Sequence, residues 1–110
     1  MNKKETEIKI QIELDENNVP ESIHWAAQDG GIEDEEAKAL FLYAWNEPLK
    51  ETLKLDLWTK EMPIDSMKKF FHQILGSMAQ TYFRATDDEE TVKEFENFAN
   101  HFAKKSGIIK

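Results

Sequence analysis

The sequence predicts an α+β protein in which a three-stranded antiparallel sheet carries three helices on one face. Two observations predict this class. Apolar and polar residues alternate at residues 8–14 and 53–57, as in half-buried strands, and apolar residues recur at helical spacing over residues 67–83. With 110 residues the chain is long enough for one hydrophobic core, so we expect a single domain spanning residues 1–110.

Three strands are expected. The first, residues 8–14, alternates isoleucines with charged or amide residues and is followed by the turn-forming segment 15–21. The second, residues 22–28, ends at the glycine pair Gly30 and Gly31, and the third occupies residues 53–57.

Three helices are expected as well, which makes the order β-β-α-β-α-α. The first runs over about residues 34–45, the second from an N-cap at Asp65 to about Arg84, and the third from a capping box at Thr86 to about Lys105. A helix that connects the second strand to the third makes those two parallel. The sheet order 2-1-3, with the first strand central, then follows from a right-handed crossover.

The net charge of −8 is concentrated in one quarter of the chain. Residues 15–36 carry no Lys or Arg, and their eight acidic residues are Asp15, Glu16, Glu21, Asp29, Glu33, Asp34, Glu35 and Glu36. Nucleic acids and anionic lipid surfaces bind basic patches, so neither is an expected partner. The alternating N-terminal segment does not resemble a signal peptide, and the longest apolar run has seven residues against the ~20 of a membrane-spanning helix. We therefore expect a cytoplasmic protein without direct membrane insertion.

Catalytic motifs are not evident in the sequence. His24, His72 and His101 fall in different expected elements without metal-binding spacing, and no cysteine is present. We therefore expect no enzyme, no metal and no cofactor. Two alternatives stay open: a small metal-dependent or acid/base enzyme that uses His24 or His72 with nearby acids, and a chaperone-like holdase.

Trp58 is the most informative single residue. It falls in register with Lys54 and Asp56, on the strand face that should be solvated, and a large aromatic side chain there often marks a contact surface. The alternative is that the strand ends at Leu57 and that Trp58 turns back to cover the core. The candidate protein-binding residues are Trp58, Asp56, Lys54 and His24 on the expected polar sheet face, with Asp15, Glu16 and Glu21 in the acidic loop.

Several runs of residues resemble one protein family. They are Trp25–Ile32, Glu35–Ala39, Asp56–Pro63 above all, Phe70–Gln73, Ser77–Ala79, Thr81–Tyr82 and Arg84–Thr86. In this order they are similar to the GldC family, small gliding-motility proteins of Bacteroidetes. The resemblance covers nearly the whole chain, although the first strand and the last helix match only in pattern.

The resemblance implies a cytoplasmic accessory protein of the gliding machinery that acts alongside a membrane lipoprotein, GldB, of the same system. It implies no catalytic residues. We expect a non-enzymatic interaction protein that binds another protein of this machinery, either GldB or a basic cytoplasmic segment of a membrane component. A homodimer is left open.

Overall fold

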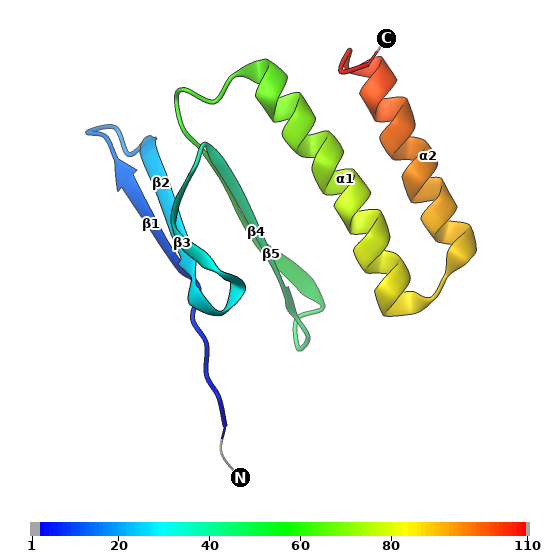
Figure 1. Ribbon diagram of the computed structural model, residues 1–110, viewed down its shortest axis with the longest axis horizontal. Helices are drawn as coiled ribbons and strands as arrows, with labels where there is room; N and C mark the ends of the chain where they lie inside the picture. The colour runs from blue at the N-terminus through cyan, green and yellow to red at the C-terminus, as the bar shows by residue number, and fades with distance from the viewer. Residues whose placement is uncertain (1–2, 110) are drawn as a thin grey trace. The chain divides into compact units, whose positions relative to one another are not determined.

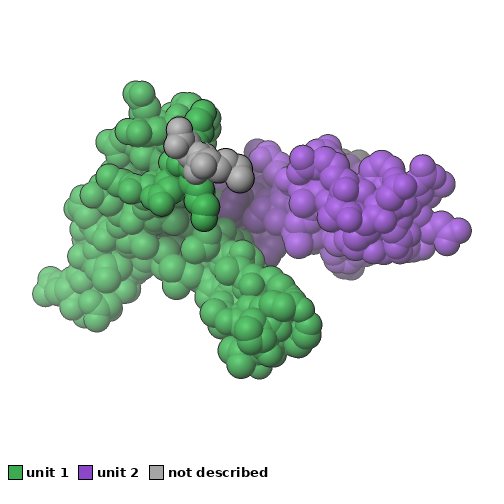
Figure 2. All heavy atoms as spheres, turned by 90° about the horizontal axis from the view of Figure 1, so that it is seen from below, with its two compact units in different colours: residues 1–62 green, residues 63–110 purple. Residues whose placement is uncertain are grey.

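The computed structural model describes residues 3–109, and it confirms the α+β class (Figure 1). Its elements in chain order are β1 (Lys9–Leu14), β2 (Pro20–Ala27), a short 3-10 helix η1 (Gln28–Gly30), β3 (Ile32–Ala37), β4 (Ala39–Asn46), β5 (Glu51–Trp58), α1 (Ile64–Thr86) and α2 (Glu89–Lys105). The chain divides into two compact units, residues 1–62 with the strands and residues 63–110 with the helices (Figure 2).

The first sheet consists of β1, β2 and β3, with β2 in the centre and both neighbours antiparallel to it. Ile23 of β2 lies between Ile12 of β1 and Ala37 of β3, and its side chain is completely buried. Because paired residues share a face, the apolar residues that alternate along β1 and β2 gather on one side. The first two predicted strands are therefore confirmed.

The predicted helix over residues 34–45 is wrong, since these residues form β3 and β4. The stretch Ala39–Trp45 is apolar at every position, and such a continuous run is compatible with a buried helix or with a strand that is apolar on both faces. Its antiparallel pairing with β5 decides for the strand. Tertiary pairing thus overrides an ambiguous local pattern.

The predicted sheet order 2-1-3 and the single sheet are not found either. Gly31, at φ 73°, donates its N–H to the Gln28 oxygen at 3.1 Å and closes a tight turn after β2. Because this turn returns the chain directly as β3, β2 becomes the central strand and no crossover is needed. The predicted third strand is β5, which pairs with β4 in a second, two-stranded sheet.

The two remaining helices form an antiparallel hairpin in residues 63–110 (Figure 1). Ala79 of α1 and Ala99 and Ala103 of α2 are buried between them, and these small side chains let the helices approach closely. Tyr82 and Phe95 close one flank of this contact, with ring centroids 5.5 Å apart.

The helix ends differ in detail from the prediction. Pro63 rather than Asp65 precedes α1, and Asp88 rather than Thr86 caps α2 by accepting the Thr91 N–H at 3.1 Å. Thr86 belongs to the last turn of α1, because Asp87 takes a left-handed conformation that ends that helix. The predicted cap of α2 was therefore two residues too early, because α1 extends through Thr86.

Candidate functional site

The hairpin formed by β4 and β5 has two distinct apolar faces. The register pairs Leu42 with Leu55 and Tyr43 with Lys54, and paired residues lie on the same face. The first face, here called the aliphatic face, comprises Leu40, Leu42, Ala44, Leu53, Leu55 and Leu57. The second, here called the aromatic face, comprises Ala39, Phe41, Tyr43, Trp45, Thr52, Lys54, Asp56 and Trp58.

The aromatic face exposes three large rings. Tyr43 is 56% exposed, Trp45 is 59% exposed and Trp58 is 53% exposed. The strand continues through Trp58, so this side chain stands on the face of Lys54 and Asp56 as the sequence predicts, and it does not turn back to cover the core. Several exposed aromatic rings on one face are typical of protein interaction surfaces.

A small polar cluster lies among these rings. The Lys54 Nζ lies 3.0 Å from Asp56 Oδ2. The Lys54 ammonium, followed by the Tyr43 hydroxyl, donates to the Asp56 carboxylate, and these bonds lower the pKa of Asp56. The same carboxylate raises the pKa of Lys54 and that of Tyr43. All three groups therefore keep their neutral-pH charge states, and the face presents a fixed positive–negative pair between aromatic rings.

The aliphatic face is also open to solvent over much of its length. Leu42 and Leu55 are each 49% exposed, and Leu53 is 55% exposed. A hairpin with apolar side chains on both faces is unusual for an isolated two-stranded sheet, which is marginally stable by itself.

His24 does not join the residues of β5. It lies on β2, opposite Gln11 of β1 and Glu36 of β3, on the polar face of the first sheet. The sequence placed His24, Lys54, Asp56 and Trp58 on one polar face, and that expectation is wrong because the strands divide into two sheets.

The acidic loop between β1 and β2 is partly neutralised. Asp15 Oδ1 accepts the N–H groups of Asn17 and Val19 at 2.8 and 3.0 Å, and its Oδ2 pairs with the Lys60 ammonium. These contacts lower the pKa of Asp15, chiefly through Lys60. Glu21 lies 4.0 Å from the same Lys60 Nζ, whereas Glu16 is exposed. Asp15 thus organises its own turn, a role that the sequence analysis did not assign to it.

The remaining acids of residues 33–36 lie on β3, an edge strand of the first sheet. Charged side chains on an edge strand discourage pairing with another chain. These acids do not stand at a helix N-terminus, and protection of this edge explains their placement instead.

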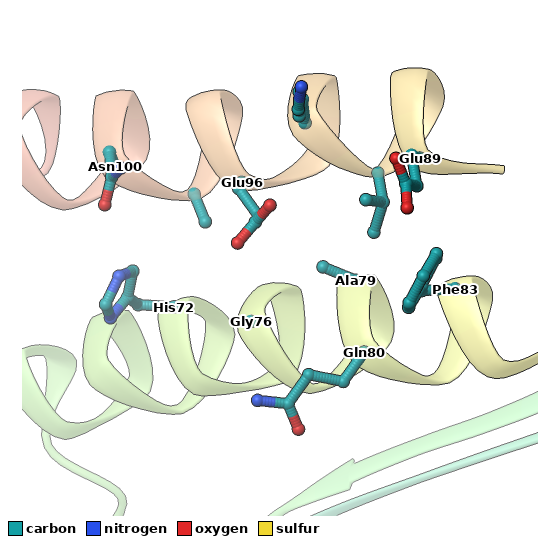
Figure 3. Close-up of a pocket in the computed structure, with 11 residues that line it drawn as sticks. His72, Gly76, Ala79, Gln80, Phe83, Glu89, Glu96 and Asn100 are labelled. Carbon is teal, nitrogen blue, oxygen red and sulfur yellow. The ribbon is translucent and has the colours of Figure 1, made fainter. Parts of the chain in front are cut away.

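His72 lines a groove between α1 and α2 of about 470 Å³ (Figure 3). Gly76 and Ala79 leave room on α1, while Glu96 and Asn100 of α2 border the same groove. Figure 3 shows His72 and Glu96 directed into the space between the helices. His24 lies on β2, in the other unit of the chain.

Within residues 3–109, no cluster of three or more His, Asp or Glu side chains is arranged to hold a metal ion. Neither of the helices formed by those residues combines the length and the hydrophobicity needed to cross a bilayer.

Sequence reasoning missed Tyr43 and Trp45 because it assigned them to a helix. Phe41, Tyr43 and Trp45 recur at every second position, which is the strand period, and this signal could have identified the aromatic face. It also missed Lys60, whose contact with the acidic loop joins residues far apart in the sequence.

The fold and this exposed face define a small α+β protein made of a strand unit and a helical hairpin, with aromatic rings and a charged pair presented on one β-hairpin. Residues 20–108 match the family described as gliding motility-associated protein GldC-like, and the chain belongs to that family. Comparison with curated proteins and with solved structures found no significant match. Membership of the family associates the protein with gliding motility and confirms the resemblance seen in the sequence.

Proposed function

We propose that this protein is a non-enzymatic, cytoplasmic accessory protein of the gliding machinery that binds another protein component through the aromatic face of the β4–β5 hairpin. The observation that carries the proposal is the exposure of Tyr43, Trp45 and Trp58 around the Lys54–Asp56 pair. Family membership supplies the cellular process, and this face supplies the means of binding.

The composition of the face favours a protein partner. Tyr and Trp are enriched among the residues that dominate binding energies, since their rings bury a large area at little cost in side-chain entropy. Lys54 and Asp56 add donors and acceptors that fix the orientation of a polar partner segment. The three rings are each more than half exposed, which suits contact with another protein surface better than enclosure of a small substrate.

The lipoprotein GldB and a basic cytoplasmic segment of a membrane component are the two partners to test first. The exposed Glu16 and the acids of β3 lie in the same unit as the aromatic face and would attract a basic segment over long range. This attraction concerns the rate of association and its salt dependence more than the final affinity.

The test is a calorimetric titration of the full chain with purified GldB, comparing wild type with Trp58→Ala. Removing a tryptophan that dominates an interface costs about 2 kcal/mol or more, which corresponds to roughly a thirtyfold weaker Kd. Phe98→Ala is the matched control, because Phe98 is an aromatic residue of equal exposure (54%) on α2. We expect Phe98→Ala to bind as wild type.

Equal affinity of Trp58→Ala and wild type would refute the assignment of this face. A loss of affinity in both variants would point to a different surface or to a general loss of folding, which circular dichroism of each variant distinguishes.

A further inference from the structure

We propose that the free edge of β5 is a self-complementary dimerisation site, at which two copies of this chain join their β4–β5 hairpins into one four-stranded antiparallel sheet. This inference is independent of the proposed partner. It concerns a second copy of the chain, and it rests on the order of residues along β5.

The edge of β5 is open. In residues 3–109 the only strand hydrogen-bonded to β5 is β4, so the opposite edge has a row of backbone groups without a strand partner. The side chains along it are exposed as well, with Leu53 at 55%, Leu55 at 49% and Trp58 at 53%. A long edge of this kind is a ready template for another strand.

The sequence of this edge complements itself. When two copies of the segment Leu53–Leu57 run antiparallel about a two-fold axis at Leu55, Lys54 of each copy lies opposite Asp56 of the other. Each Leu53 then faces a Leu57, and the two Leu55 side chains meet on the axis. Opposite charges at directly paired positions stabilise a sheet, and here the symmetry supplies two such pairs.

Neighbouring registers are penalised by the same two residues. A shift of two positions in one direction places Lys54 opposite Lys54 of the second chain. The same shift in the other direction places Asp56 opposite Asp56 of the second chain. Like charges at directly paired positions destabilise a sheet. A shift of one position would place the aliphatic face of one hairpin beside the aromatic face of the other. Charge and pattern together therefore select one register.

The other free edges are less suited to this pairing. β3 carries acids at 33–36, which would repel a second β3, and β4 has no charged residue to select a register. β1 also brings Lys9 opposite Glu13 when it pairs with itself, but its pairing with β2 shifts register at Glu13/Leu14. Its Ile10 and Ile12 are already partly buried, so less apolar area is left to gain.

Pairing at β5 would stabilise the two-stranded sheet, which is marginally stable by itself. Leu42 and Leu55 of both copies would form one continuous row across four strands, because Leu42 is already paired with Leu55 within each copy. Three or more strands with a shared apolar face are stable where a two-stranded hairpin is marginal.

Cross-linking tests the register directly, because the chain contains no cysteine. In Leu55→Cys, the two new thiols would lie on the two-fold axis at an opposed-pair Cα distance of about 4.5–5.5 Å, within disulfide reach. In the matched control Leu53→Cys, the equivalent Cα atoms would be offset by four residues along neighbouring strands, about 14 Å apart, and too distant to bridge. We expect mild oxidation to cross-link the full-length Leu55→Cys chain rapidly and the Leu53→Cys chain slowly.

Charge exchange tests the interface at equilibrium. Sedimentation of the wild-type chain should show a dimer, whereas Lys54→Asp alone and Asp56→Lys alone should each dimerise at least about tenfold more weakly, since attraction becomes repulsion at two positions. An equimolar mixture of the two single variants should recover a heterodimer, because opposite charges then face each other again. Lys9→Glu on β1 is the control and should leave dimerisation unchanged.

Three results would overturn the proposal. They are a wild-type chain that stays monomeric throughout the micromolar range, equal cross-linking of Leu55→Cys and Leu53→Cys, and a dimer that Lys54→Asp does not weaken. A dimer lost instead in Lys9→Glu would assign the interface to β1.

Discussion

Ile23 provides the sharpest test of the strand unit. It is the one large side chain in residues 3–109 that is fully buried, and it stands on the central strand between Ile12 and Ala37. Replacement by alanine removes three carbon atoms, which is worth about 2.4 kcal/mol at ~0.8 kcal/mol per buried methylene. The cavity left behind adds to this loss, so we expect a total of about 3 kcal/mol, within the 2–5 kcal/mol range of such changes.

The measurement is urea unfolding of the full-length chain, followed by far-ultraviolet circular dichroism. Ile23→Val should cost about 0.5–1.5 kcal/mol, because it removes a single methyl-sized group. Ile8→Ala is the control: Ile8 is 66% exposed, and surface changes of this kind usually alter stability by less than about 0.5 kcal/mol. In a thermal melt, the alanine variant should lose roughly 12 °C, at about 4 °C per kcal/mol for a chain of this size.

The loss of unfolding free energy should be largest for Ile23→Ala, smaller for Ile23→Val and smallest for Ile8→Ala. If Ile23→Ala cost no more than Ile8→Ala, then Ile23 would not be in a close-packed core and the three-stranded sheet would be assigned incorrectly.

Two further predictions concern carboxylates. Hydrogen bonds from the Thr91 side chain, the Thr91 N–H and the Tyr82 hydroxyl lower the pKa of Asp88. Its ionised form therefore stabilises the fold fully above the ordinary aspartate pKa of 3.8 and less as the pH falls through the lowered value. Melting temperatures of wild type and Asp88→Asn should therefore differ at neutral pH and converge in acid, and a constant difference across pH would contradict this. In the acidic loop, Asp15→Asn should lower the melting temperature because it weakens the Lys60 pair, whereas Glu16→Gln should not; equal effects would show that Asp15 is merely solvated.

The local sequence pattern was sufficient to predict the secondary structure of a segment wherever its apolar residues followed one clear period. The alternation at 8–14 and 53–57 correctly predicted β1 and β5, and the stripe from Met67 to Phe83 correctly predicted α1. In each case apolar residues recur on one side of the segment and polar or charged residues on the other, so only one secondary structure gathers the apolar set on a single face.

The prediction failed where the period was ambiguous. Residues 39–45 are apolar at every position and so fit a helix as well as a strand, and the acids at 34–36 fit a helix N-terminus as well as an edge strand. Once a helix was assumed there, the sheet order 2-1-3 and the shared polar face followed from it, and both were wrong for this single reason.

The sequence predicted the part of the candidate site that lies on β5 but not the part that lies on β4. Lys54, Asp56 and Trp58 were recognised as one face because they lie on a single strand, where spacing of two fixes the side of each residue. Tyr43 and Trp45 were not recognised as part of this face, because their position beside Lys54 and Thr52 depends on the register between two strands.

The sequence by itself determined the α+β class, the extent of most elements, the family and the concentration of negative charge, since each depends on composition or on neighbours within one segment. Only the tertiary structure decided which strands pair, that the strands form two sheets, and that Lys60 meets the acidic loop. These features depend on contacts between residues distant along the chain. A local pattern restricts such contacts, but the packing of the whole unit selects among them.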